Sequence, residues 1–229
     1  MIKSYKEYIN ESAGVELTQD QKNWLDGFTE GTWQLNPKTG LVDVSGNFDC
    51  SWKDLDSFKG VRFGQVSGRF WCYNNKLTSL EGAPQSVGGG FSCSDNNLTS
   101  LLGAPQSVRG GFSCSSNNLT SLLGAPQSVG GYFGCNYNNL TSLEGAPQSV
   151  GGDFSCYDNK LTSLKGFPME IKGEIDLDSN PIWKEIAPLL KGMSEDEKRF
   201  FYKFAAVDQT GDAESLGRIA RSIERIRMI

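Results

Sequence analysis

A strict period of 21 residues constrains this chain more than any other feature of its sequence. The unit V-x-G-x-F-x-C-x-x-N-x-L-T-S-L-x-G-x-P occurs five times in succession, with a looser copy on either side. The copies begin at Val44, Val66, Val87, Val108, Val129, Val150 and Ile171. A repeat this short cannot bury its own apolar face, so the array predicts a solenoid with seven strand positions.

Each unit is typical of one short parallel strand followed by a turn. Valine, glycine, phenylalanine and cysteine alternate with other residues, so we expect the former to point inward and the latter outward. The leucines of L-T-S-L turn back into the core, and the proline, which has no N–H for a ladder, lies outside the sheet. The asparagine that follows the strand is expected to satisfy buried backbone groups, at Asn75, Asn96, Asn117, Asn138 and Asn159.

The core of the unit carries a family resemblance. F-x-C-x-x-N-x-L resembles the L-x-L-x-x-N-x-L core of leucine-rich repeats over residues 44–182, and N-x-L-T-S-L is similar to the short repeats of bacterial effector proteins. This chain departs from the family in having glycine at the first strand leucine and G-A-P-Q-S in place of a convex helix. The resemblance implies an α/β repeat, a leucine-rich-repeat solenoid whose concave strand face binds a protein.

The flanking segments are expected to cap the two open ends of the solenoid. In residues 12–43, Thr18 precedes a predicted helix from Gln19 to about Phe28, and two predicted strands follow, joined by the turn at 37–40. Residues 183–229 predict three helices, the second of which begins at the capping-box pair Ser194 and Glu197. The third is apolar on one stripe and flanked by arginines, which suits packing on the solenoid end, an acidic partner, a membrane surface or self-association.

Composition limits the chemistry that the chain can perform. Histidine, the commonest general base and transition-metal ligand, is absent, and each of the six cysteines lies in a predicted inward strand position. We therefore expect buried thiols, no metal or other cofactor and no enzyme. A net charge of −5 is unsuited to nucleic acid, and neither a membrane span nor a secretory signal is recognisable, so we expect a cytoplasmic protein.

The first eleven residues, MIKSYKEYINE, form a short amphipathic segment. They resemble the capsid-targeting peptide of internal head proteins in large contractile-tailed bacteriophages, which the prohead protease removes after an aliphatic-x-glutamate site. Cleavage here would fall between Glu11 and Ser12. The resemblance implies packaging in the virion head before delivery to the host cytoplasm, whereas an ordinary frayed helix is the other interpretation.

Outward strand positions are the candidate binding site, because the inward ones are committed to packing. They carry aromatic and charged side chains of the kinds that dominate interfaces. These are Arg69, Trp71, Tyr73, Tyr132, Asn136, Asp153, Tyr157, Glu174 and Asp176. The leading hypothesis is a phage-encoded inhibitor that binds a host defence protein stoichiometrically. The alternatives are a structural or scaffold-associated virion component that binds a phage protein and, heavily discounted, a ubiquitin-ligase-like effector enzyme.

Overall fold

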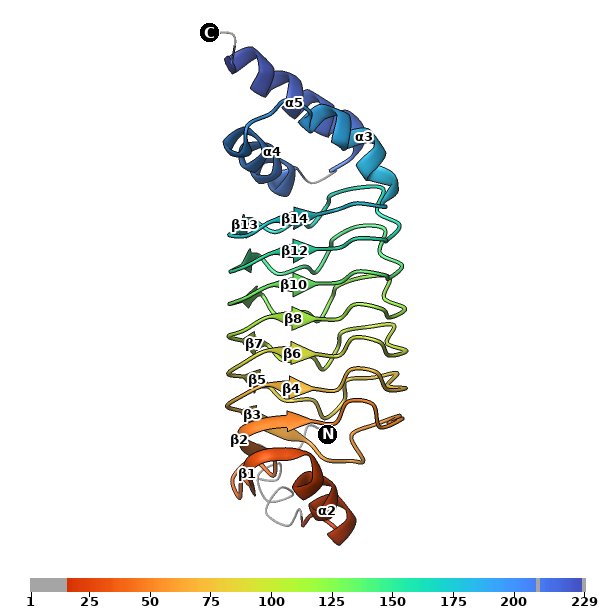
Figure 1. Ribbon diagram of the computed structural model, residues 1–229, viewed down its shortest axis with the longest axis vertical. Coiled ribbons are helices and arrows are strands. Elements are labelled where there is room, and N and C mark those ends of the chain that lie inside the picture. The colour runs from red at the N-terminus through yellow and green to blue at the C-terminus, as the bar shows by residue number, and fades with distance from the viewer. Residues whose placement is uncertain (1–15, 209–210, 228–229) are drawn as a thin grey trace, which may run out of the picture.

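The fold is a parallel-strand solenoid closed at each end by other elements (Figure 1). It comes from a computed structural model that describes residues 16–208 and 211–227. Residues 1–11, with the predicted processing site at Glu11 and Ser12, lie outside the described residues. At the N-terminal end, helix α2 (Gln19–Phe28) begins at a capping box in which Thr18 and Gln21 bond each other's backbone. The helix predicted from Thr18 is thus confirmed.

The N-terminal hairpin is continuous with the first coil. Strands β1 (Thr29–Leu35) and β2 (Val42–Asp49) pair antiparallel, and β2 then pairs with the next coil in parallel. Trp24 and Leu25 of α2 are buried against this first coil, with the Trp24 and Phe48 rings 5.2 Å apart. The hairpin and helix therefore cover both the apolar end and the strand edge that an open solenoid would expose.

Each coil after the first contributes two short strands, whereas the alternating pattern predicted one. The first ladder consists of β3 (Phe63–Val66), β5 (Ser86–Val87), β7 (Ser107–Val108), β9 (Ser128–Val129), β11 (Ser149–Val150) and β13 (Glu170–Ile171). The second consists of β4 (Phe70–Trp71), β6 (Phe91–Ser92), β8 (Phe112–Ser113), β10 (Phe133–Gly134), β12 (Phe154–Ser155) and β14 (Ile175–Asp176). Only β2 is long enough to pair with both ladders.

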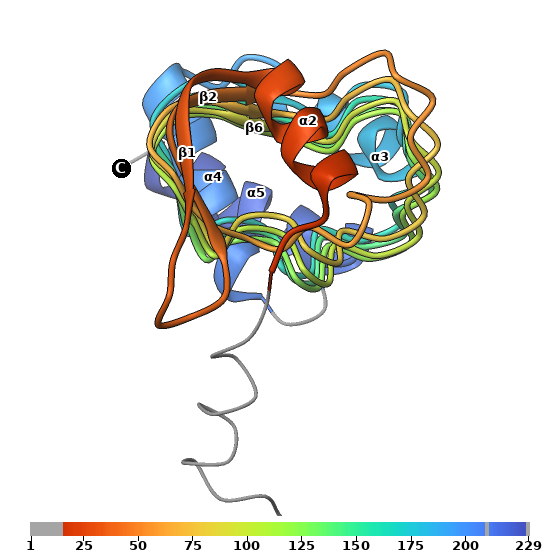
Figure 2. The ribbon, with the colours of Figure 1, turned by 90° about the horizontal axis from the view of Figure 1, so that it is seen from below.

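Glycines make the corner between the two ladders. A Cβ atom at Gly89 would lie 2.9 Å from the backbone carbon and oxygen of Gly68 in the preceding coil. The coils approach too closely there for a side chain, so the strand breaks and the chain changes direction. Viewed along the column, the two ladders lie on adjacent sides and the coils nearly superpose (Figure 2). The column is therefore close to straight, and its faces are close to flat where the resemblance implied a concave one.

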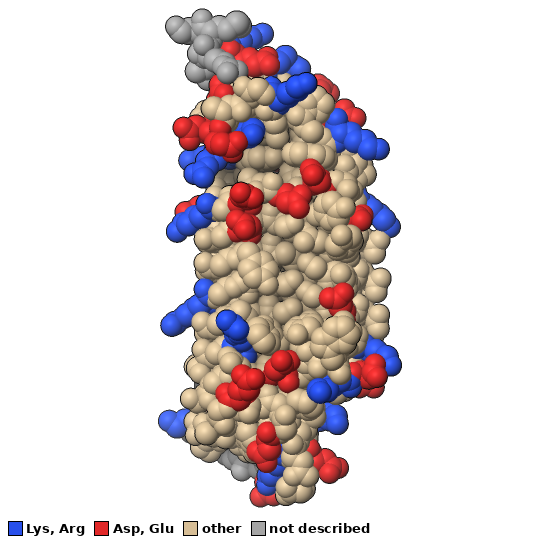
Figure 3. Space-filling model, viewed as in Figure 1, with Lys and Arg blue, Asp and Glu red and all other residues tan. Residues whose placement is uncertain are grey.

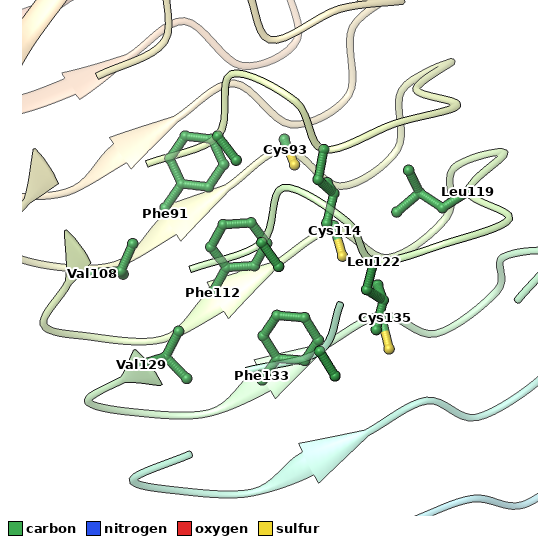
Figure 4. Packing of buried hydrophobic residues seen from close by; sticks show 14 of the residues in the cluster. Phe91, Cys93, Val108, Phe112, Cys114, Leu119, Leu122, Val129, Phe133 and Cys135 are labelled. Carbon is green, nitrogen blue, oxygen red and sulfur yellow. The ribbon is translucent and has the colours of Figure 1, made fainter. Parts of the chain in front are cut away.

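The interior is a stack of identical layers. Phenylalanine rings of adjacent coils stack with centroids 5.2 to 5.8 Å apart, from Phe70 to Phe154. The cysteines, leucines and valines of each coil pack beside them (Figure 4). All six cysteines are buried and free, as the inward phase of their positions predicted. They act as small apolar side chains of the core.

A ladder of buried asparagines runs along the column, as predicted, and extends to Asn180. Asn117 is representative. Its amide nitrogen donates to the carbonyl oxygens of Cys93, Cys114 and Ser115 at 3.0 to 3.2 Å, and its oxygen accepts the Leu98 N–H at 2.9 Å. One side chain thus satisfies backbone groups of two coils where the chain leaves the strand.

Three helices close the C-terminal end, as predicted: α3 (Pro181–Leu190), α4 (Glu195–Val207) and α5 (Ala213–Arg227). The Ser194 and Glu197 capping box begins α4. Tyr202 of α4 stacks on Phe167 of the last full repeat at 5.2 Å. No helix in the described part of the chain is long and apolar enough to cross a membrane.

Candidate functional site

The outer side of the second ladder presents seven adjacent strand positions to one side of the molecule. We call this surface the strand face and define it by residues 47–52, 69–74, 90–95, 111–116, 132–137, 153–158 and 174–179. Phenylalanine or isoleucine, and then cysteine or leucine, point inward from each segment, so the remaining side chains are directed outward. The nine residues predicted for binding all belong to this one face.

An aromatic cluster occupies the N-terminal part of the strand face. The Arg69 guanidinium lies 5.1 Å from the Trp71 ring centroid, and Trp71 in turn meets Tyr73 edge to face at 6.4 Å. Tyr73 contacts Trp52 of the preceding coil at 6.5 Å. Trp71 and Tyr73 are half-buried by these contacts, while Trp52 is 68% exposed. We name Trp52, Arg69, Trp71 and Tyr73 the first aromatic cluster.

A second aromatic cluster lies three strands farther along. Tyr137 and Tyr157 meet edge to face at 5.3 Å, and Tyr137 is 54% exposed. The exposed ring of Tyr132 lies across Gly111 of the neighbouring coil, in the space that a side chain there would fill. We name Tyr132, Tyr137 and Tyr157 the second aromatic cluster. The Tyr132 ring of this cluster packs on the small residue Gly111.

Trp52 and Tyr137 hold the same place in their coils, and that place is conformationally unfavourable for them. The second residue after the inward cysteine or leucine has positive φ in every coil, between 51° and 60°. Asparagine, aspartate or serine holds it in the other five coils, and asparagine and aspartate tolerate this left-handed conformation best. An aromatic residue there costs folding energy and is mostly exposed. Neither residue is explained by the needs of the fold.

Between the clusters the strand face is small and polar. The hydroxyl oxygens of Ser94 and Ser113 are 2.6 Å apart. Asn136, predicted as a binding residue, uses its side-chain oxygen within the protein, accepting from the Ser155 hydroxyl at 2.7 Å and the Tyr157 N–H at 2.9 Å. This side chain thus joins adjacent strands and supports the position of Tyr157.

The C-terminal part of the strand face is acidic. Asp153 and Glu174 are exposed on adjacent coils, and the Asp153 carboxylate accepts the Glu174 N–H at 2.9 Å. Asp176 is half-buried, with a carboxylate oxygen 3.3 Å from the Ser155 hydroxyl oxygen. Figure 3 shows charged side chains gathered toward the two ends of this face, with a mostly uncharged middle. The predicted residues therefore form two groups, Arg69 with Trp71 and Tyr73, and Tyr132 through Asp176.

The cysteines behind this face are not placed for nucleophilic chemistry. Burial raises the pKa of the thiols well above its ordinary value, which keeps them protonated and unreactive. This holds for Cys50, Cys72, Cys93, Cys114 and Cys135. Within residues 16–208 and 211–227, no three cysteine, aspartate or glutamate side chains gather as metal ligands would.

A hollow of about 750 Å³ lies on the other ladder, between β1 and the outer sides of β3, β5 and β7. Serine, threonine and glutamine make up half of its lining residues. Its one acid, Asp43, accepts the Gln65 N–H at 2.8 Å and the Asn36 side-chain amide at 3.2 Å. Those bonds hold the hairpin onto the first coils, so we assign Asp43 a structural role.

Sequence reasoning missed Trp52 and Tyr137, because the alternation that identified outward residues ends one position before them. A signal was present nonetheless: the repeat position that they share with Asn74, Asp95 and Asp158 is rich in residues that favour left-handed backbone.

The chain has no significant match among known family models, curated proteins or solved structures. Its function is therefore argued from the geometry of the strand face.

Proposed function

We propose that this chain is a non-enzymatic binding protein whose strand face docks a protein partner. The observation that carries the proposal is the placement of Trp52 and Tyr137, two exposed aromatic side chains at left-handed positions that fold stability disfavours. Strain of this kind persists where function requires the side chain. Tryptophan and tyrosine are also the residue types that most often anchor protein interfaces.

The size and shape of the face support a macromolecular partner. Six intervals between seven strands, at about 4.8 Å each, make the face roughly 29 Å long. The two aromatic clusters lie about three strands apart, or roughly 14 Å. Small-molecule sites are concave and enclose most of their ligand. A nearly flat face with two separated anchors instead suits a partner that contacts both clusters at once (Figures 2 and 3).

The charges on the face suggest the chemistry of the partner. Asp153, Asp158, Glu174 and Asp178 are exposed beside the second aromatic cluster, and the whole chain carries a net charge of −5. A basic patch on the partner would complement this end and accelerate association. The first aromatic cluster places Arg69 beside three aromatic rings, so it suits a mainly apolar pocket on the partner.

The left-handed positions allow a test in which binding and stability change in opposite directions. Trp52→Asn and Tyr137→Asn replace a bulky residue by one that favours left-handed backbone, so each variant should unfold at a higher temperature, by roughly 1 kcal/mol of stability. Each should also lose about 2 kcal/mol or more of affinity for a partner captured by the wild-type chain. Trp71→Ala and Tyr157→Ala should weaken binding with little change in melting temperature.

The matched control is Leu102→Ala, because Leu102 is 70% exposed and lies outside the strand face. This variant should bind normally. The proposal is wrong if the strand-face variants all bind like wild type while variants in the caps lose the partner. The solenoid would then be a spacer between the functional ends.

The resemblance of residues 1–11 to a capsid-targeting peptide supports a more specific proposal. In it the chain is a phage-encoded inhibitor of a host defence protein, packaged in the virion head and acting in the host cytoplasm. Co-expression with a prohead protease of such a phage should produce a new N-terminus at Ser12, and Glu11→Gln should prevent it. An intact chain beside a cleaved control substrate would refute processing. A partner of phage rather than host origin would favour the virion-component alternative.

A further inference from the structure

Helix α4 has apolar side chains on two opposite faces, and only one of these faces is covered. Phe201, Tyr202 and Ala205 are buried, with Tyr202 on the solenoid end. Phe200, Phe204 and Val207 recur at helical spacing on the other face, where Phe204 is 45% and Val207 60% exposed. A helix that is apolar on both faces is typical of one packed between two neighbours.

The exposed face combines a ridge with a hollow. The Phe200 and Phe204 rings pack together with centroids 4.6 Å apart and form the ridge. Beside it, between α4 and α5, lies a hollow of about 480 Å³ lined by Phe204, Val207, Ile219 and Ile223 among others. We call this ridge and hollow the cap patch. Isolated exposed apolar residues are ordinary, whereas a contiguous patch of this kind marks an interaction site.

We infer that the cap patch joins two copies of this chain in a symmetric dimer. A twofold interface requires one surface to be complementary to itself, and the cap patch offers both a ridge and a hollow that can receive the ridge of a second copy. The charges around the patch are also self-complementary. An acid and a base both line the hollow: Asp208 follows the end of α4, and Arg218 lies on α5.

This mixture of charges selects a second copy over other occupants. A rim of one sign would repel its own copy, and a membrane-binding helix pair would present a mainly basic rim to anionic lipid. Here both signs border the same apolar centre. The cap patch also lies beyond the last coil, at the end opposite α2 (Figure 1). Dimerisation there leaves both strand faces open, so a dimer would present two copies of the proposed binding face.

The test is the mass of the purified chain in solution, measured by sedimentation or light scattering from about 1 to 100 µM. The wild-type chain should have the mass of a dimer that dissociates on dilution. Phe204→Glu places a charge on the ridge and should raise the dimer dissociation constant by roughly 30-fold or more. Leu102→Glu places the same charge on an exposed apolar residue outside the cap patch and should leave the dimer intact.

Ser222→Arg is a second test of the dimer, which is needed if Phe204→Glu fails to fold. Ser222 is exposed at the mouth of the hollow, so Ser222→Arg should fill the hollow without disturbing the buried side of α5 and should also dissociate the dimer. Circular dichroism checks that each variant is folded. A wild-type chain that remains monomeric at 100 µM overturns the inference, as does a dimer that survives both substitutions. Monomers that bind anionic lipid vesicles through the cap patch would also overturn it.

Discussion

Removing one asparagine from the middle of the ladder tests the physical basis of the fold. Asn117→Ala deletes four hydrogen bonds, but the free-energy cost of losing them differs from one to another. The carbonyls of Cys93 and Cys114 keep a bond from Asn96 and Asn138 respectively. The carbonyl of Ser115 also keeps a partner, because it accepts the Asp95 N–H at 2.9 Å.

The Leu98 N–H is the group left without a partner, because its bond at 2.9 Å is to the Asn117 side-chain oxygen. A buried N–H without a partner costs about 1 to 3 kcal/mol, and each of the other three lost bonds contributes a smaller amount. We therefore expect Asn117→Ala to destabilise the protein by about 3 to 5 kcal/mol. Asn117→Asp should cost more, because it points a carboxylate at three carbonyl oxygens.

Chemical denaturation followed by circular dichroism measures the free energy of unfolding. Hydrogen exchange at the Leu98 amide measures the local opening that a repeat array permits. The matched control is Asn118→Ala, because Asn118 is the exposed neighbour and contributes its backbone N–H to Leu98. A difference below about 1 kcal/mol between Asn117→Ala and Asn118→Ala would refute the reasoning, since one orphaned N–H alone accounts for that much.

The core permits three further predictions. Five thiols have a pKa raised by burial from an ordinary value of 9.0, so above pH 9 they ionise in the unfolded state only and stabilise it. The contribution of these thiols to stability should be constant below about pH 8 and should fall by about 1.4 kcal/mol per thiol at pH 10. Cys114→Ala should reduce this loss of stability by the contribution of one thiol. A bulky thiol reagent should label the cysteines only after denaturation. Rapid labelling of the folded chain would contradict their burial. Phe112→Ala opens a gap between rings 5.2 and 5.4 Å away and should cost roughly 3 to 5 kcal/mol, measured by thermal unfolding, while leaving the exposed strand face and partner binding intact.

The repeat by itself determined the solenoid, its buried layers and its asparagine ladder. Each of these follows from side-chain alternation within a strand and from identical residues stacked at a fixed interval. The helix starts at Thr18 and Ser194 were equally readable, because a capping box is completed within four residues. Local patterns suffice where the deciding contacts are local or repeat without change.

Tertiary structure decided what depends on contacts between non-equivalent positions. After the first coil, the glycine corners divide each predicted strand in two, because neighbouring backbones approach too closely for a Cβ atom. No single repeat contains that distance. Asn136 is partly committed to Ser155 and Tyr157 because its neighbours differ from those of the corresponding serines. Phe201 is buried and Phe204 exposed, although both are phenylalanines of α4, because only one side of α4 meets the solenoid. Trp52 lies on the strand face because the backbone is left-handed at the end of the strand. Alternation of side chains along a strand does not predict this placement.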